Sequence, residues 1–287
     1  MSVADAIDRY AVLGHPVRHS QSPFIHAEFS RQTGQAIDYS RIECSLDGFA
    51  AAVRAFAASG ARGCNVTVPF KFESGALARQ VTPRAHLAQA ANVLRFDAGG
   101  WLADNTDGIG LVRDIQGNAG FRLQGRRVLL IGAGGAAAGV LGPLIEARPA
   151  AIHVANRTAH KADVLVRRHA ACAATHGVSL QGSGLDTVDG RFDLVLNSSA
   201  SSLHGAGVPV GSQVLAPGAL AIDFMYGAAA DAFMAWARSA GARAHDGLGM
   251  LVEQAAEAFF VWRGVMPDTT PVLRSLRDRL DLAPTGR

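Results

Sequence analysis

A glycine-rich turn between a strand pattern and a helix pattern constrains this chain more than any other feature. Residues Arg127–Ile131 form a short β-prone run, Gly132-Ala-Gly-Gly-Ala-Ala137 follows it, and a helical stretch comes next. In a unit made of a strand, a G-x-G-x-x-A turn and a helix, the glycines let the backbone approach a pyrophosphate. The N-terminus of the helix supplies partial positive charge. A plain turn is the alternative, but the order of elements favours dinucleotide binding.

The same region is not a membrane span, although Val128 to Ile145 carries no charge. Its glycines and Pro143 indicate a buried strand, a turn and a helix start. Asp5 and Asp8 precede any apolar run, so the N-terminus does not resemble a signal peptide. The three cysteines are far apart and form neither a disulfide framework nor a metal-ligand cluster. We therefore expect a soluble, cytoplasmic protein without a resident metal.

Composition excludes disorder as the main state of these 287 residues, since 49% are hydrophobic and only 18% are charged. The net charge of +3 comes without a dense basic run, so we expect no nucleic-acid partner. β-rich runs alternate with helical stretches, which predicts an α/β chain with largely parallel sheets. The β-rich runs are Tyr10–Leu13, Ile37–Cys44, Asn65–Val68, Val128–Ile131, Ile152–Ala155, Phe192–Leu196 and Leu220–Phe224, with a hairpin over Asn92–Ala103.

The position of the glycine turn predicts two α/β domains. We place a first domain at residues 1–106 and a Rossmann-type dinucleotide domain at residues 107–246. The last helical stretch, Leu248 to Trp262, follows the final strand of the second domain. We expect it to return to the first domain, so that residues 247–287 complete a discontinuous domain there.

The residues after the second Rossmann strand favour NADP over NAD. NAD-binding domains carry an acidic residue about 20 residues after the glycine turn, where it binds the ribose 2′-hydroxyl. Here Asn156-Arg157-Thr158 follows that strand, with Lys161 shortly after and no carboxylate at the tip. Arg157 and Lys161 are suited to hold a 2′-phosphate through charge-assisted hydrogen bonds. The alternative is a solvated helix start.

Lysine is rare in this chain: of the 27 lysines and arginines, only Lys71 and Lys161 are lysines. Arginine cannot be deprotonated in practice, whereas lysine can move a proton. Lys71 is therefore a candidate for chemistry, with chance survival on a solvated face as the alternative. Ser22 followed by Pro23 predicts a helix N-cap and first residue, and with Ser20 it offers hydroxyls for a small carboxylate at the helix start.

Other polar residues each have a plain structural alternative when taken singly. Thr67 fits a strand residue, Asp107 a helix N-cap, Tyr226 a core residue and Gln254 a solvated helix residue. Taken together, the motifs resemble the shikimate dehydrogenase family from about Tyr10 to Leu280. They are Ser20-x-Ser22-Pro23, Asn65-Val-Thr-Val-Pro-Phe-Lys71, Asn92, Asp104-Asn-Thr-Asp-Gly108, Gly132-Ala-Gly-Gly-Ala136, Asn156-Arg-Thr158 and Asp246-Gly-Leu-Gly-Met250.

The resemblance implies a substrate domain and an NADP domain facing across a cleft, and the reversible reduction of 3-dehydroshikimate to shikimate by hydride transfer from NADPH. It implies Lys71 and Asp107 as the catalytic pair. It assigns the substrate carboxylate to Ser20, Ser22 and Tyr226, and the ring hydroxyls to Asn65, Thr67, Asn92, Asp107 and Gln254. The implied cofactor positions are Gly132, Ala133, Gly134, Gly135, Ala136, Asn156, Arg157, Thr158, Lys161, Phe224, Gly247 and Met250.

Two alternatives stay open at this point. One is a quinate or dual-specificity quinate/shikimate dehydrogenase. The other is a non-catalytic NADP-binding sensor on the same fold, which would be expected to lose Lys71 or Asp107. In either case we expect a small-molecule ligand, no membrane partner, and a monomer or homodimer.

Overall fold

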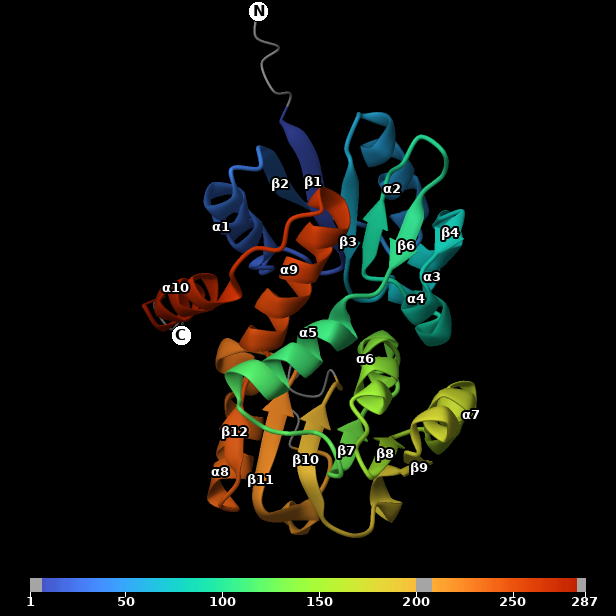
Figure 1. The fold of residues 1–287 in the computed structure, drawn as a ribbon, viewed down its shortest axis with the longest axis vertical. Helices are drawn as coiled ribbons and strands as arrows, with labels where there is room; N and C mark the ends of the chain where they lie inside the picture. Colours follow the sequence, from blue (N-terminus) through green and yellow to red (C-terminus); the bar gives the residue numbers. More distant parts are fainter. Residues whose placement is uncertain (1–6, 200–207, 283–287) are drawn as a thin grey trace, which may run out of the picture. The chain divides into compact units, whose positions relative to one another are not determined.

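A computed structural model describes residues 7–199 and 208–282, which fall into two compact units (Figure 1). Unit 1 comprises residues 1–110 and 252–287, and unit 2 comprises residues 111–251. The boundaries fall inside helices α5 (Asp107–Arg113) and α9 (Leu248–Arg263). The predicted α/β class with two sheet-containing units is confirmed, and each of the seven predicted β-rich runs coincides with a strand.

The sheet of unit 1 has the strand order β2-β1-β3-β5-β6-β4 in the described part of the chain. β1 runs parallel to β2 and β3, whereas β5 runs antiparallel to β3 and β6. The turn at Asp97–Gly100 closes the β5–β6 hairpin, and Gly100 adopts φ 123°, which favours glycine there. The strands are β1 (Asp8–Gly14), β2 (Ile37–Glu43), β3 (Gly63–Val66), β4 (Gln80–Val81), β5 (Val93–Arg95) and β6 (Leu102–Asp104).

The helices of unit 1 bring segments distant in sequence together. α1 (Ser22–Thr33) lies against β1, β2 and α10 (Thr269–Asp281), so the last described helix packs beside the first (Figure 1). α9 contributes the fully buried Phe259, which contacts Phe29 of α1 edge-on. The other helices of this unit among the described residues are α2 (Phe49–Ala58), α3 (Lys71–Ser74) and α4 (Pro83–Ala88).

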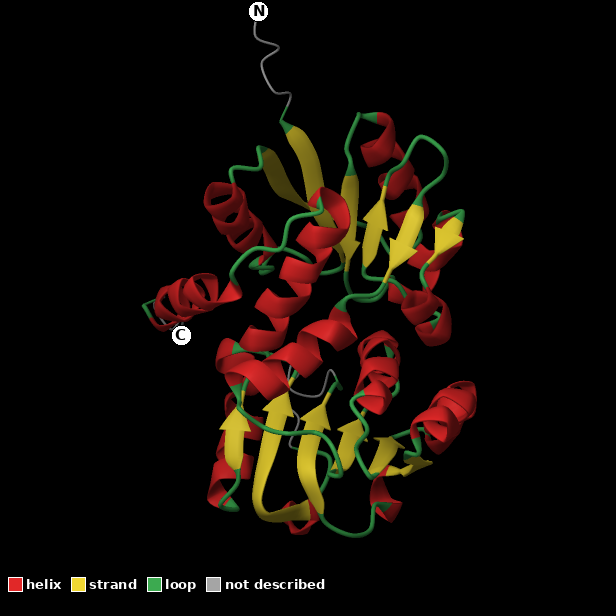
Figure 2. Ribbon diagram, in the orientation of Figure 1, coloured by secondary structure: helices red, strands yellow, loops and turns green. Residues whose placement is uncertain are grey.

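The sheet of unit 2 is parallel throughout, with the strand order β12-β11-β10-β7-β8-β9 among the described residues (Figure 2). The order reverses between β7 and β10, so the carboxyl ends of these strands form the switch point where doubly wound folds bind ligands. The elements are β7 (Arg127–Ile131), α6 (Gly135–Glu146), β8 (Ala151–Asn156), α7 (Ala159–His176), β9 (Ser179–Gly184), β10 (Phe192–Asn197), β11 (Leu215–Asp223), α8 (Asp231–Ser239) and β12 (Arg243–His245).

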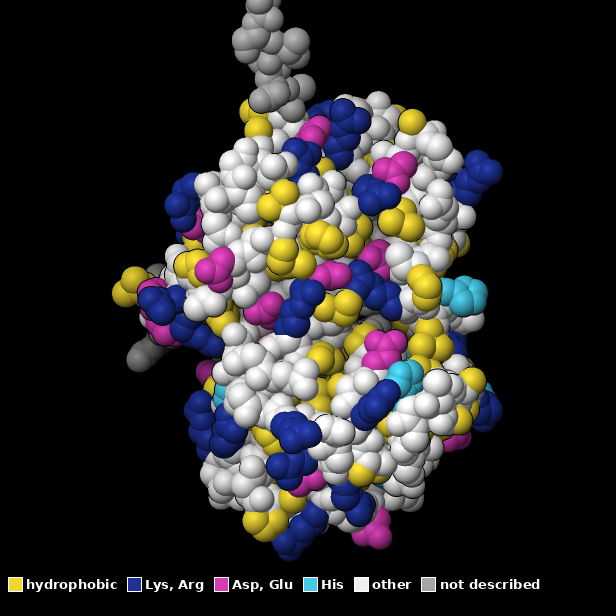
Figure 3. Space-filling model, viewed as in Figure 1, with side chains coloured by type: hydrophobic (Ala, Val, Ile, Leu, Met, Phe, Trp, Pro, Cys, Tyr) yellow, Lys and Arg dark blue, Asp and Glu magenta, His cyan; other side chains and the backbone are white. Residues whose placement is uncertain are grey.

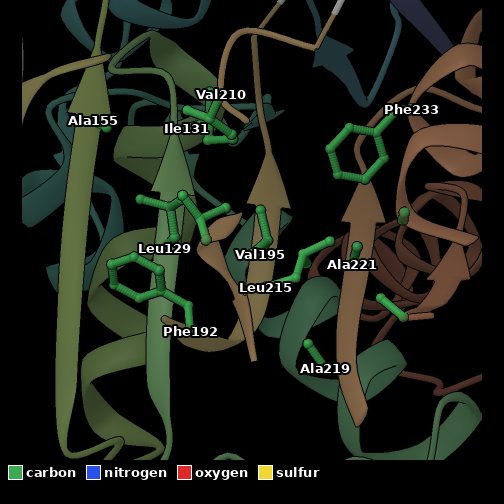
Figure 4. Close-up of a cluster of buried hydrophobic side chains, with 13 residues drawn as sticks. Leu129, Ile131, Ala155, Phe192, Val195, Val210, Leu215, Ala219, Ala221 and Phe233 are labelled. Carbon is green, nitrogen blue, oxygen red and sulfur yellow. The ribbon is translucent and has the colours of Figure 1, made fainter. Parts of the chain in front are cut away.

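The charge-free run of the sequence is the core of unit 2. Residues 128–131 of β7 are all buried, which means that both faces of the strand are covered. Leu129 and Val195 pack with Phe192 and Phe233 in one cluster (Figure 4). Each such side chain contributes about 1.5–3 kcal/mol when it leaves water. This burial holds the glycine turn at the end of β7 in place.

Two further features of the described residues are the character of their helices and the distribution of charge on their surface. No helix among them combines the length and the apolar character that crossing a bilayer requires. On the face drawn in Figure 3, Lys and Arg side chains are scattered among side chains of other types.

Candidate active site

Lys71 is the first residue of α3, which begins shortly after β3. A turn closed by the hydrogen bond from Phe70 N to Thr67 O (3.0 Å) precedes it, and the fully buried Phe70 anchors that turn. The carbonyl of Lys71 accepts hydrogen bonds from Ala91 N (2.8 Å) and Ser74 Oγ (3.0 Å). The backbone of Lys71 is therefore fixed, and its side chain extends from a rigid base.

The ammonium of Lys71 lies against the carboxylate of Asp107. Lys71 Nζ donates to Asp107 Oδ2 at 2.6 Å, and the two side chains are only 14% and 5% exposed. Asp107 is held by its own backbone N–H, which donates to Asn105 Oδ1 at 3.1 Å. Because little water screens this pair, the attraction between the charges is stronger than at a surface. The structure thus brings together the two residues proposed as the catalytic pair.

Asn92 links Asp107 to α9. Its Nδ2 lies 2.9 Å from Asp107 Oδ1, 2.9 Å from Thr106 Oγ1 and 3.1 Å from Gln254 Oε1. Its Oδ1 accepts from Thr106 N at 2.8 Å, which fixes the orientation of the amide. Three residues singled out in the sequence, Asn92, Asp107 and Gln254, therefore meet in one buried network. Such a network offers donors and acceptors suited to hydroxyl groups.

Asn65 and Thr67 extend this polar region along β3 and the residues after it. Asn65 Nδ2 donates to the carbonyl of Asn92 at 3.1 Å. Thr67 N donates to Leu13 O at 2.9 Å, which ties the turn to β1. A Cβ at Gly14 would lie 2.3 Å from Thr67 Cγ2, so this approach requires glycine. Residues 65 and 67 are two apart, the spacing at which side chains of an extended segment share a face.

The predicted N-cap role of Ser22 is wrong. α1 begins at Ser22 itself, and Gln21 occupies the cap position without a side-chain hydrogen bond. The physical reason is that Ser20 Oγ accepts from Ser22 N at 3.3 Å, so the hydroxyl at the helix start comes from Ser20. Ser20 Oγ also donates to Ser22 Oγ at 3.1 Å, and Arg41 donates to the carbonyl of Ser20. The two hydroxyls remain paired at the start of α1.

In unit 2, the turn between β7 and α6 has the geometry expected of a phosphate-binding loop. Gly132 adopts φ 108°, and a Cβ there would lie 2.5 Å from Ser198 Oγ. Gly134 is the N-cap of α6 and provides no side-chain cap, and a Cβ on it would meet no atom within 4 Å. Open space beside uncapped helix amides fits a pyrophosphate. Ala133, Gly135 and Ala136 lie in the same turn and first helical residues.

The end of β8 carries the residues expected to select the cofactor. Asn156 is its last residue, and its Nδ2 donates to Thr158 O at 3.0 Å, which closes the turn into α7. Arg157 is exposed just before α7, and Lys161 is exposed in its first turn. Because β8 pairs in parallel with β7, this tip lies on the same edge of the sheet as the glycine turn. Two exposed cations at that edge fit a 2′-phosphate.

Phe224, Gly247 and Met250 surround the ends of β11 and β12. A Cβ at Gly247 would lie 2.4 Å from Phe224 O, and Gly247 N donates to Met225 O at 2.8 Å, so the two loops touch through backbone. Met250 is buried in the following helix. Tyr226 lies after β11 in unit 2, whereas the other predicted substrate-binding residues belong to unit 1. The described residues contain no His, Cys, Asp and Glu cluster suited to a metal ion.

Arg84 is a residue of the site region that sequence reasoning missed. Its guanidinium binds Asp104 at 2.7 and 2.5 Å and Glu257 of α9 at 3.0 Å. Burial alone would raise the pKa of Asp104, but the hydrogen bonds and charge of Arg84 outweigh it and hold that pKa below the ordinary value. Arg84 thus fastens the Asp104–Asp107 turn to the helix that carries Gln254. No sequence signal relates these positions, which lie far apart in the chain.

Three family models match this chain. The shikimate dehydrogenase substrate binding domain matches residues 12–94, shikimate / quinate 5-dehydrogenase matches residues 114–204, and the shikimate 5′-dehydrogenase C-terminal domain matches residues 247–277.

Similar proteins of known name and structure cover nearly the whole chain. A shikimate dehydrogenase (NADP(+)) of Methylibium petroleiphilum is 62% identical over 98% of each chain. The structure of an Ael1 enzyme from Pseudomonas putida is 45% identical with a TM-score of 0.85, over 94% of this chain and 98% of that one. Shikimate 5-dehydrogenase of Thermus thermophilus, in complex with NADP(H) and shikimate, is 28% identical with a TM-score of 0.81, over 96% of this chain and 100% of that one.

Replacing Arg84 by methionine should lower the free energy of unfolding by about 3 kcal/mol near pH 7, since it removes the cation that pairs with two largely buried carboxylates, Asp104 and Glu257. Asp104 has a folded pKa below its ordinary value of 3.8, so its contribution is present above that value and is lost as pH falls through the folded pKa. The difference between wild type and variant should therefore shrink below about pH 4. Urea denaturation across this range measures it.

Arg62→Met is the matched control, because Arg62 pairs with Asp8 at an exposed position. It should cost no more than about 1 kcal/mol. Equal losses in the two variants would contradict the role assigned to Arg84.

Proposed function

Because this chain belongs to the shikimate dehydrogenase family, we propose that it catalyses the NADP-dependent, reversible reduction of 3-dehydroshikimate to shikimate in the biosynthesis of aromatic amino acids. The observation that carries the proposal is the buried contact of 2.6 Å between Lys71 and Asp107, with Asn92 and Gln254 around it. We further propose that the enzyme works in the cytoplasm as a monomer or homodimer.

The cofactor side of unit 2 supports binding of NADP. The uncapped start of α6 with open space at Gly134 suits the pyrophosphate, and the exposed Arg157 and Lys161 suit the 2′-phosphate. When bound, NADPH supplies the hydride. Phe224, Gly247 and Met250 are proposed to contact the rest of the cofactor, where the hydrogen bond from Gly247 N to Met225 O joins the two loops.

On the substrate side, the hydroxyls of Ser20 and Ser22 are proposed to bind the carboxylate of the substrate, together with Tyr226. The ring hydroxyls are proposed to bind Asn65, Thr67, Asn92 and Gln254, of which Asn92 and Gln254 are already oriented by their mutual contact of 3.1 Å. Groups fixed in this way hold the reacting carbon in one place without further ordering.

Lys71 and Asp107 are proposed to carry the proton. During reduction, hydride adds to the carbonyl carbon, and the ammonium of Lys71 gives a proton to the carbonyl oxygen, which becomes the new hydroxyl. The reverse reaction returns this proton to Lys71. Asp107 accepts a hydrogen bond of 2.6 Å from Lys71 and so holds the ammonium in position for this transfer. An NADP-binding sensor would have no need of this buried pair.

Absorbance of NADPH at steady state tests the proposed function directly. We expect turnover with shikimate and NADP⁺, much slower turnover with quinate, and none without an acid. Quinate carries an extra hydroxyl on the carbon that bears the carboxylate, and the serine pair is closed to 3.1 Å. An unpaired buried hydroxyl costs about 1–3 kcal/mol. Equal use of both acids would favour the dual-specificity alternative, and no turnover with either would favour the sensor.

Lys71→Ala should lower kcat by roughly 10²- to 10⁴-fold, the usual contribution of general acid–base catalysis. Lys71→Arg serves as the charge-preserving comparison, because arginine keeps the pairing with Asp107 but does not release its proton. Both variants should bind NADP⁺ as wild type does, measured by fluorescence titration. If Lys71→Arg retained full activity, Lys71 would act through its charge and not through its proton.

Arg157→Ala should weaken NADP⁺ binding and leave NAD⁺ binding nearly unchanged. A hydrogen bond to a charged group contributes about 1.5–3 kcal/mol, so the preference for NADP⁺ should fall by roughly 10- to 100-fold. Arg167→Ala within α7 is the control, since Arg167 is also exposed but lies about two turns into that helix. Equal losses for the two cofactors would show that Arg157 has a purely structural role.

A further inference from the structure

Tyr39 lies in β2 and has no role in the reaction so far. Its ring is buried and stacks on the fully buried ring of His26, with centroids 4.2 Å apart and planes 10° from parallel. The ring of Trp262 in α9 also packs against the Tyr39 ring, with centroids 6.3 Å apart. The Tyr39 hydroxyl leaves this aromatic cluster and donates to Asn65 Oδ1 at 2.7 Å. The side chain is thus locked by packing at one end and by a hydrogen bond at the other.

The partners of Asn65 determine how its amide is oriented. The carbonyl of Asn92 can only accept, so the amino group of Asn65 must face it, as the 3.1 Å contact shows. Asn65 Oδ1 then faces Tyr39, whose hydroxyl must donate. Beyond these two bonds the amide has one further N–H, and the side chain also interacts with His26. Both held ends come from groups that are themselves fixed.

We propose that Tyr39 is a positioning residue that holds the amide of Asn65 in the orientation in which it binds a ring hydroxyl of the substrate. This inference rests on the proposed function of the chain. Without the Tyr39 hydroxyl, Asn65 Oδ1 loses its donor in a buried place, and of these two bonds only the one to the Asn92 carbonyl still holds the amide. The remaining N–H then no longer points in one direction, and substrate binding becomes weaker.

The hydroxyl of Tyr39 is suited to this task because it stays neutral. Burial raises the pKa of Tyr39 well above its ordinary value of 10.0, although the neighbouring Ser22 and Arg41 offset part of that shift. A neutral hydroxyl keeps its proton and therefore keeps donating to Asn65 throughout the pH range below the ordinary pKa of tyrosine. The contact with Ser22 also places this hydroxyl between residues proposed for the carboxylate and for the ring.

Tyr39→Phe removes only the hydroxyl and tests the inference, and Tyr10→Phe is the matched control. Tyr10 is also buried and also stacks on Trp262, with centroids 4.6 Å apart, but its hydroxyl interacts with Arg263. Tyr39→Phe should lower kcat/KM for shikimate about 3- to 10-fold, the range of one hydrogen bond, with KM for NADP⁺ unchanged. Tyr10→Phe should change neither value by more than about twofold, the low end of that range.

A double-mutant cycle with Asn65→Ala separates positioning from general packing. If Tyr39 acts through Asn65, adding Tyr39→Phe to Asn65→Ala should cause no further loss of kcat/KM. A full additional loss in the double variant, or equal behaviour of Tyr39→Phe and Tyr10→Phe, would overturn the inference and leave the proposed function intact. A wild-type enzyme that neither binds nor converts shikimate would instead overturn the proposed function, and this inference with it.

Discussion

The buried ion pair between Lys71 and Asp107 is the constraint on which the rest of the site in unit 1 depends. Removing two such charges from water costs several kcal/mol for each, and the pair offsets this only if the remaining polar atoms are also bonded. Asp107 meets that condition, because Oδ2 takes Lys71 and Oδ1 takes Asn92. The side chain of Lys71 is 14% exposed, and its ammonium group has hydrogen-bond donors beyond the one that binds Asp107. The same arrangement that makes the pair tolerable therefore leaves it able to serve a ligand.

The need to satisfy every buried polar group also explains the depth of the network. The amino group of Asn92 faces Asp107 because the backbone N–H of Thr106 donates to the oxygen of the same amide. The amino group of Asn65 likewise faces the carbonyl of Asn92, because the Tyr39 hydroxyl donates to the oxygen of the Asn65 amide. Each of these two amides is thus fixed by a partner to which no ligand contact is assigned. Such partners determine geometry in the way that outer ligands orient the inner ones of a metal site.

Much of the fold was predictable from local patterns, and the exceptions have physical causes. The strands β9 and β12 were missed because β9 is rich in glycine and serine, and β12 has three residues. Ser22 was assigned as the helix cap because serine before proline has that preference. The cap position is instead Gln21, and the backbone N–H of Ser22 donates to the hydroxyl of Ser20. Arg84 gave no signal, because its buried partners Asp104 and Glu257 are neighbours only after folding.

The two halves of the proposed site differ in how visible they are in a sequence. The cofactor side is shaped by backbone. A turn that needs φ 108° at Gly132, or a place at Gly247 where a Cβ would lie 2.4 Å from Phe224 O, favours glycine. Such a turn leaves a short, recognisable motif. The substrate side is built from side chains such as Lys71, Asn92 and Gln254, which come from three separate segments. Each is one ordinary polar residue in its own segment, so only their joint order along the chain indicated a site, and only the folded sheet shows why they meet.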